Sequence, residues 1–139
     1  MTELAQPLSD PRAAIENWAA GWSSHDVNLL LSLFTEDCLY EDVTLGVVNR
    51  GKDELKAFAE GFFAFSPDLR LQVTRSGASV GFAACEWRFW GTQQKEFMGK
   101  AAKGAQWSLR GMSSFELRDG KIQRCSDYWD LNSLLKQLG

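Results

Sequence analysis

Histidine is almost absent from this sequence, since its 139 residues include a single one, His25. One histidine excludes a histidine-rich metal site and a histidine pair for acid–base catalysis. The sequence also lacks CxxC, HExxH and EF-hand patterns, so we expect no bound metal. His25 lies in "SSHD" beside Asp26, and we interpret it as a loop or capping residue rather than a catalytic one.

Cysteines, clustered basic residues and long apolar runs are also scarce. The three cysteines are widely spaced, and an odd count without paired spacing fits reduced, buried thiols. Fifteen Lys and Arg against 18 Asp and Glu give a net charge of −3, which argues against nucleic acid as a partner. No apolar run approaches the ~20 residues that span a bilayer. The start "MTELAQPLSDPRAA" lacks the basic and apolar regions of a secretory signal. We therefore expect a cytoplasmic protein without membrane partners.

Aromatic residues, by contrast, are plentiful. Six Trp and nine Phe in a chain of this length exceed what a minimal core requires. Either the core is densely filled with rings, or part of the aromatic set lines a pocket, and both can hold for different residues. The length fits one domain over residues 1–139, in which residues 1–10 are expected to form a flexible segment.

The first half of the chain has helical patterns. Asp10 and Pro11 are typical of a helix start, and apolar residues then recur at helical spacing as far as Trp22. Asp26 caps a second, short helix whose expected buried side is Val27, Leu30, Leu31 and Phe34. A short strand is expected near residues 39–43, followed by a third helix over residues 49–65.

The second half of the chain alternates apolar and polar residues, which predicts strands. The expected strands cover 69–75, 82–92, 107–117 and 122–129, with a loop at 93–106 and a closing helix at 130–139. Helices followed by antiparallel strands predict an α+β fold. A curved sheet wrapped around a long helix would form a cone with a pocket at its open end.

The last expected strand, in "KIQRCSDYWDL", contains an unusual acid, Asp127. Strand alternation places Asp127 on the same face as Cys125 and Trp129. If that face is the core, the carboxyl group loses hydration, its pKa rises toward neutrality, and it can act as a general base. Alternatively, Asp127 is exposed to solvent or forms a structural ion pair with Arg88 or Arg124.

Tyr40 and Asp42 share one side of the first expected strand. That phase could place a phenol and a second carboxylate in the same cavity, where Tyr40 could donate a hydrogen bond to a substrate oxygen. Two carboxylates facing one cavity would push each other's pKa values apart. Alternatively, Tyr40 belongs to the pocket wall and Asp42 caps the next turn.

The layout and several motifs resemble the nuclear-transport-factor-2-like superfamily, and most closely its SnoaL-like polyketide cyclase branch. The motifs are "LFTEDCLYED", "GKDEL", "GTQQKEFMG" and "DGKI" followed by an Asp-aromatic pair. The resemblance extends over residues 15–138. It implies a cystatin-like cone, a pocket for a small hydrophobic molecule, no cofactor, and a homodimer formed through the outer sheet face.

The resemblance also implies roles for individual residues. Asp127 matches the acid–base aspartate of SnoaL-like cyclases and the aspartate of limonene-type epoxide hydrolases. Asp42, in "YEDV", matches the general base of ketosteroid isomerases. Two matches fail, because Ser113 stands where the cyclases have histidine and Gly111 stands where the isomerases have an oxyanion-stabilising aspartate.

An epoxide hydrolase would further need an inward Glu86 or Arg88 and a water between Tyr40 and Asp127. We instead expect Trp87 to point inward, with Glu86 and Arg88 as a surface pair.

Together these patterns predict a cofactor-independent acid–base enzyme of the cyclase or isomerase type, acting on a small hydrophobic carbonyl compound. The expected catalytic residues are Asp127, Asp42 and Tyr40. The expected substrate-binding residues are Trp18, Phe58, Trp87, Phe89, Ser113, Phe115 and Trp129. The alternatives are a limonene-type epoxide hydrolase and a non-catalytic ligand-binding or interaction domain.

Overall fold

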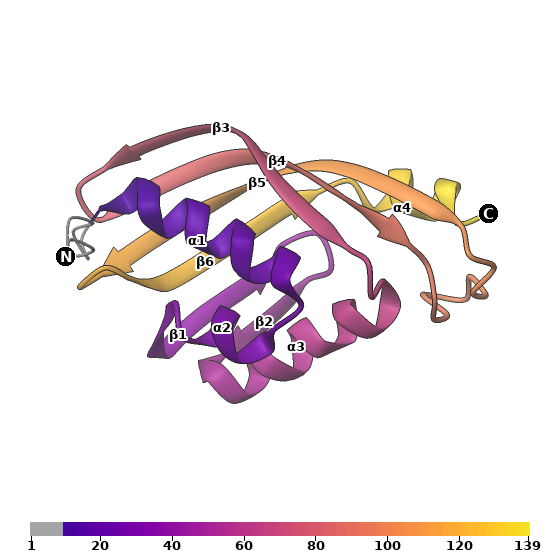
Figure 1. Ribbon diagram of the computed structural model, residues 1–139, viewed down its shortest axis with the longest axis horizontal. Helices are drawn as coiled ribbons and strands as arrows, with labels where there is room; N and C mark the ends of the chain where they lie inside the picture. Colours follow the sequence, from indigo (N-terminus) through magenta and orange to yellow (C-terminus); the bar gives the residue numbers. More distant parts are fainter. Residues whose placement is uncertain (1–9) are drawn as a thin grey trace.

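The computed structural model describes residues 10–139 as one curved sheet with helices packed against it (Figure 1). In chain order the elements are α1 (Pro11–Ser24), α2 (Val27–Leu31), β1 (Phe34–Asp42), β2 (Val47–Arg50), α3 (Gly51–Phe65), β3 (Arg70–Ser79), β4 (Phe82–Thr92), β5 (Gln106–Arg118), β6 (Lys121–Trp129) and α4 (Leu131–Gln137). The predicted α+β fold is confirmed. The flexible segment predicted for residues 1–10 lies outside the described residues except for Asp10.

The strands form a single six-stranded sheet in the order β2-β1-β6-β5-β4-β3. The pairing of β1 with β6 is parallel, and the other pairings are antiparallel. Helix α1 packs against β3 and β4, while α3 packs against β1. The sheet therefore curves around these two helices, and its inner face meets their apolar sides (Figure 1).

Side-chain caps start helices α1 and α2 where the sequence predicts them. The Asp10 carboxylate accepts a hydrogen bond from the backbone N–H of Arg12 at 2.9 Å, with Pro11 in the first turn. The Asp26 carboxylate accepts from the N–H groups of Asn28 and Leu29 and caps α2. These contacts satisfy N–H groups that a helix leaves without intrahelical partners. The predicted start sites of α1 and α2 are thus confirmed.

The region around Phe34 differs from the prediction. Phe34 is fully buried, but it begins β1 and pairs with Ile122 of β6 instead of lying on the second helix. The helical spacing Val27–Leu30–Leu31–Phe34 continued by chance into the strand, because both elements bury the same side of the chain. Strand β2 was not predicted, since its four residues pair only at the sheet edge.

Candidate active site

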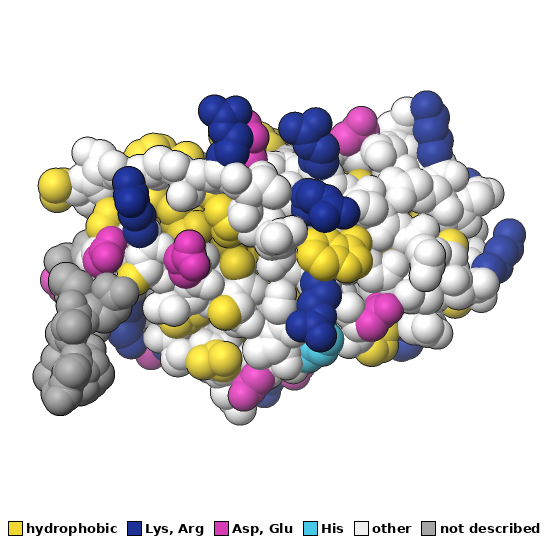
Figure 2. Space-filling model, turned by 45° about the horizontal axis from the view of Figure 1, so that its top comes forward, with side chains coloured by type: hydrophobic (Ala, Val, Ile, Leu, Met, Phe, Trp, Pro, Cys, Tyr) yellow, Lys and Arg dark blue, Asp and Glu magenta, His cyan; other side chains and the backbone are white. Residues whose placement is uncertain are grey.

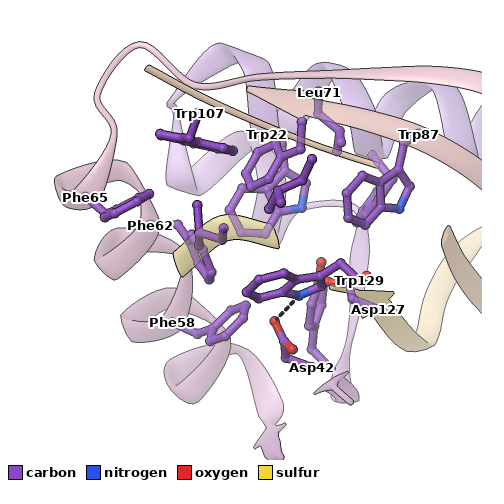
Figure 3. Close-up of a pocket in the computed structure, with 15 residues that line it drawn as sticks. Trp22, Asp42, Phe58, Phe62, Phe65, Leu71, Trp87, Trp107, Asp127 and Trp129 are labelled. Carbon is purple, nitrogen blue, oxygen red and sulfur yellow. Dashed lines mark hydrogen bonds between the residues drawn. The ribbon is translucent and has the colours of Figure 1, made fainter. Parts of the chain in front are cut away.

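A cavity of about 30 Å³ lies between the inner face of the sheet and the helices. Its walls are mostly aromatic and include only two carboxylates (Figure 3). The lining residues are Trp18, Trp22, Tyr40, Asp42, Phe58, Phe62, Phe65, Leu71, Trp87, Phe89, Trp107, Leu109, Asp127, Trp129 and Leu134. The free volume holds one or two water molecules, so a larger ligand must displace the half-buried rings of Phe58, Phe62, Phe89 or Trp129.

Strand register explains why the polar groups meet at one place. Asp42, Asp127 and Ser113 are direct neighbours across β1, β6 and β5. Residues in such a row point to the same side of the sheet, here the inner side. The sequence separates these residues by up to 85 positions, and the parallel pairing of β1 with β6 brings them together.

Asp127 is held by a hydrogen-bond chain that runs from an indole. The Nε1–H of Trp87 donates to Ser113 Oγ at 2.9 Å, and the Ser113 hydroxyl donates to Asp127 Oδ1 at 2.6 Å. The Cys125 thiol donates to the same oxygen at 3.5 Å. Because an indole can only donate, the serine hydroxyl must direct its own proton to the carboxylate. Among residues 10–139, Asp127 Oδ2 receives no comparable hydrogen bond.

Burial raises the pKa of Asp127 to about 7, although the hydrogen bond from Ser113 and the nearby hydroxyl group of Tyr40 oppose the shift. The negative charge of Asp42 raises it further. A carboxyl group with this pKa is partly ionised at neutral pH and can both take up and release a proton. The arrangement therefore suits general acid–base chemistry at the oxygen that remains without a partner.

Gly111 leaves the space that the Trp87 indole fills. The two residues are opposite each other on β5 and β4, and a Cβ on Gly111 would stand 2.3 Å from the Trp87 ring. An aspartate at this position, as the ketosteroid isomerase pattern requires, would therefore collide with the ring. The glycine at position 111 therefore excludes that aspartate and at the same time makes room for the indole that donates to Ser113.

Tyr40 contributes a buried hydroxyl group close to Asp127. Burial raises the pKa of the Tyr40 phenol well above its usual value, and the charge of Asp127 raises it further. Among residues 10–139 the hydroxyl oxygen has no well-formed hydrogen bond. The group therefore stays protonated at neutral pH and keeps a donor available for an oxygen in the cavity.

Asp42 is buried too, but both of its oxygens are occupied. Oδ2 accepts from Trp129 Nε1–H at 3.1 Å, and Oδ1 accepts from the backbone N–H of Leu45 at 2.9 Å (Figure 3). Burial raises the pKa of Asp42, while these two hydrogen bonds oppose the rise. Thr44 also exchanges two hydrogen bonds with the Trp129 backbone. Asp42 thus both caps a turn and fixes Trp129.

The predicted substrate-binding residues divide into two groups. Trp18, Phe58, Trp87, Phe89 and Trp129 line the cavity, as do all three residues predicted to be catalytic.

Ser113 and Phe115 do not line it, although both are buried. Ser113 lies behind Asp127 within the hydrogen-bond chain, and the ring of Phe115 packs edge-on against Trp18 with ring centres 5.0 Å apart. Strand alternation correctly predicts that both side chains point inward, but it does not show how deep in the core a side chain lies.

Several lining residues were missed by the sequence analysis. They are Trp22 of α1, Phe62 and Phe65 of α3, Leu71 of β3, Leu109 of β5, and Leu134 of α4. The helical spacing of Trp18 and Trp22 places both on the same face of α1. That spacing could have predicted Trp22, but the same pattern also marks ordinary core residues.

Glu86 and Arg88 lie on the outer side of the sheet. The Glu86 carboxylate is 3.9 Å from the Arg75 guanidinium, and Arg88 stacks on Trp90 with its guanidinium carbon 5.0 Å from the ring centre. Trp87 between them is buried and points inward. The inward orientation that an epoxide hydrolase would need for Glu86 or Arg88 is therefore not found.

His25 has a structural position. It ends α1 in the left-handed conformation, with φ 60°, and its Nε2 lies 2.8 Å from the Leu69 carbonyl oxygen.

Within residues 10–139 no three His, Cys, Asp or Glu side chains form a group that could hold a metal ion. None of the helices that the structure describes is long and apolar enough to cross a membrane.

Comparisons with known proteins agree with this geometry. Residues 12–138 match the family model described as SnoaL-like polyketide cyclase. The chain belongs to this family. No match is found among curated proteins.

Solved structures share the fold of this SnoaL-like chain at low sequence identity. IdmH from Streptomyces antibioticus, described as a suspected polyketide cyclase, is 22% identical with a TM-score of 0.82, and the match covers 94% of this chain and 99% of IdmH. TsrD from Streptomyces laurentii is 23% identical with a TM-score of 0.81, over 92% and 93% of the two chains. A protein from Catenulispora acidiphila with a ketosteroid isomerase-like fold, solved with trimethylamine, is 23% identical with a TM-score of 0.79, over 91% and 92%.

Proposed function

We propose that this protein is a cofactor-independent acid–base enzyme of the cyclase or isomerase type, with Asp127 as the general base. One observation carries the proposal: Asp127 is buried at an aromatic cavity, with Oδ1 held by Ser113 and Oδ2 without a hydrogen-bond partner in the described part of the chain. The substrate class is a small hydrophobic carbonyl compound, because aromatic walls favour apolar ligands and a neutral-range base suits carbon acids.

The chemistry follows from the positions of the groups. Asp127 Oδ2 removes a proton from the carbon next to a carbonyl group, and the electron pair moves to the carbonyl oxygen, which becomes an enolate. Tyr40 donates a hydrogen bond to that oxygen. Return of the proton to another carbon completes an isomerisation. Attack of the enolate carbon on a second carbonyl group, followed by transfer of the proton from Asp127 to the new alkoxide oxygen, completes an aldol cyclisation. Either product has the mass of the substrate.

Turnover measured by mass spectrometry tests the proposal. Wild type and Asp127→Asn are incubated with a panel of polyketide-type keto-esters, steroid enones and terpene epoxides. The expected result is a wild-type product of unchanged mass and new retention time. The asparagine variant should still bind the substrate but not convert it. Equal turnover by the two proteins would contradict the role of Asp127.

A non-catalytic ligand-binding domain is a second candidate, favoured by the small free volume of the cavity, about 30 Å³. In that case the aromatic rings fill the cone themselves. Ligand binding without conversion of any compound in the panel would support this candidate. A product that gains the mass of water would instead support an epoxide hydrolase, against the outward positions of Glu86 and Arg88.

We also infer a homodimer formed through the outer sheet face. Met112 and Tyr128 are opposite each other on β5 and β6, and each is nearly half exposed. Basic side chains are scattered over the face shown in Figure 2, with acidic and hydrophobic side chains between them. Light scattering of wild type and Tyr128→Glu tests the dimer, and an unchanged mass at the monomer value in both proteins would contradict it.

A further inference from the structure

Two indole N–H groups of the cavity wall have no hydrogen-bond partner in the part of the chain that the structure describes. They are Nε1 of Trp18 and Nε1 of Trp22, and the side chains of both residues are almost completely buried. Buried N–H groups in folded proteins nearly always find an acceptor, because leaving one unpaired costs free energy. An unpaired donor in a cavity wall therefore indicates that something in the cavity accepts from it.

The surroundings of the two indoles differ. Trp18 Nε1 lies near the hydroxyl of Tyr40, where it lowers the pKa of the phenol and thus offers that oxygen a donor. Trp22 has four aromatic rings around it, with the centres of Tyr40, Phe62, Phe63 and Phe89 between 5.6 and 6.3 Å from its own. Of these four residues only Tyr40 carries an oxygen, and no acceptor within residues 10–139 lies at hydrogen-bond distance from the Trp22 N–H.

Trp107 provides an internal contrast. It lines the same cavity, but its Nε1–H donates to Ser66 Oγ at 3.2 Å. Trp87 donates to Ser113, and Trp129 donates to Asp42. Four indoles besides Trp18 thus line the cavity, and Trp22 alone among these four lacks an acceptor within residues 10–139.

We propose that Trp22 is a specificity-determining residue whose indole N–H binds a second oxygen of the substrate, distinct from the carbonyl oxygen held by Tyr40. This inference rests on the proposed function. Trp22 selects ligands that carry two acceptor oxygens on a flat, otherwise apolar frame. The ring system packs against Phe62 and Phe89, and the second oxygen needs to accept but not to donate.

Matched ketones test the proposal. The probes are 1-tetralone and its 5-, 6- and 7-methoxy derivatives, in which an ether oxygen that only accepts is moved around one frame. Affinities are measured by calorimetry for wild type, Trp22→Phe and the control Trp107→Phe. Wild type should bind one methoxy isomer about tenfold more tightly than 1-tetralone, as expected for one hydrogen bond. Trp22→Phe should lose this preference, and Trp107→Phe should retain it.

The outcomes separate this inference from the proposed function. Binding of 1-tetralone without preference for any methoxy isomer would overturn the role of Trp22 alone. Loss of the preference in both tryptophan variants would also overturn it, because a widened pocket would then explain the effect. If wild type binds none of these ketones, both proposals are overturned.

A second measurement does not depend on the folding of a variant. In wild type, the preferred methoxy isomer should move the indole proton resonance of Trp22 downfield, and 1-tetralone should not. An ordered water that stays on the Trp22 N–H with the ligand bound would contradict the proposal.

Discussion

Asp127 and Asp42 face the same cavity from neighbouring strands, yet they are bound differently. Asp127 has one oxygen fixed by Ser113 and the other without a protein partner within the described residues. Asp42 has one oxygen on the Leu45 backbone and the other on the Trp129 indole. Burial raises the pKa of both carboxyl groups. The difference shows that burial alone does not make a base, because a base also needs an unoccupied oxygen at the substrate.

From this difference we propose that Asp127 carries out the proton transfer and that Asp42 supports the structure of the site. A carboxylate that satisfies two N–H donors stabilises the turn and the ring that it holds, and any change there alters the shape of the cavity. A carboxylate with one oxygen held is oriented but remains reactive at the other.

Replacing each carboxylate by its amide should separate the two roles. Asp127→Asn should lower kcat about 1,000-fold, since positioned proton transfer contributes 10²- to 10⁴-fold. Asp42→Asn should lower kcat about tenfold or less and raise KM, because the amide keeps only one acceptor oxygen for the N–H groups of Leu45 and Trp129. Steady-state kinetics on the substrate found by mass spectrometry checks both values. Equal losses of kcat in the two variants would contradict the different roles of Asp127 and Asp42.

Stability against pH should show the burial of Asp127. Its carboxyl pKa is about 7 in the folded protein and near 3.9 in the unfolded chain, so the folded state binds the extra proton between these values. Wild type should therefore lose stability relative to Asp127→Asn as the pH rises from 4 to 7, by about 1.4 kcal/mol per pH unit and by about 4 kcal/mol in total. Urea unfolding at several pH values measures the difference. A difference independent of pH would contradict the burial of an ionisable group.

Replacing Asp42 by alanine should lower the free energy of unfolding more than replacing it by asparagine. Asp42→Ala leaves the N–H groups of Leu45 and Trp129 without acceptors and should cost about 2 kcal/mol in free energy of unfolding. Thr44→Val, which removes the hydroxyl group that binds the Trp129 backbone, provides a matched test and should act in the same direction. Wild-type stability in both variants would show that the turn does not depend on these contacts.

Ser113 should affect the reaction through the pKa and the orientation of Asp127. Its hydrogen bond lowers the pKa of Asp127, so Ser113→Ala should raise that pKa further and shift the rising limb of the kcat/KM profile to higher pH. We expect kcat to fall about tenfold at neutral pH, because less base is ionised and the carboxylate is less firmly oriented. Ser126→Ala is the control, since Ser126 is buried but bonds to Glu41 on the other side of β6. An equal effect of the two alanines would point to packing.

Arg88 should have the smallest effect. Its side chain lies on the outer face against Trp90, so Arg88→Gln should change kcat/KM less than about twofold. A large loss of activity would place a charge from β4 in the reaction and would revive the epoxide hydrolase alternative.

The fold could be predicted from local patterns because they report burial directly. The caps Asp10 and Asp26, and the alternation through Cys125, Asp127 and Trp129, each follow from backbone chemistry and side-chain periodicity. Strand β2 has four residues, too few to show a period. Phe34 lies where a helical pattern continues into a strand, so spacing alone assigned it to the wrong element.

The site was only partly predictable, because its contacts join distant segments. Strand parity placed Tyr40, Asp42 and Asp127 at one cavity wall. It did not reveal the chain from Trp87 through Ser113, which depends on the register of β4, β5 and β6. Nor did it show that Asp42 has both oxygens occupied. Those facts require the three-dimensional pairing, since the partners in the chain of hydrogen bonds are 26 and 14 residues apart and Asp42 and Trp129 are 87 residues apart, which leaves no local signal.

The most direct test of the account is the titration of the two carboxyl groups themselves. Carbon NMR of protein labelled at the aspartate carboxyl carbon, with Asp127→Asn and Asp42→Asn for assignment, follows each group without any substrate. We predict that Asp127 is still protonated at pH 5 and titrates at about 7. Titration of Asp127 near pH 4, as for an exposed aspartate, would contradict its role as the buried general base.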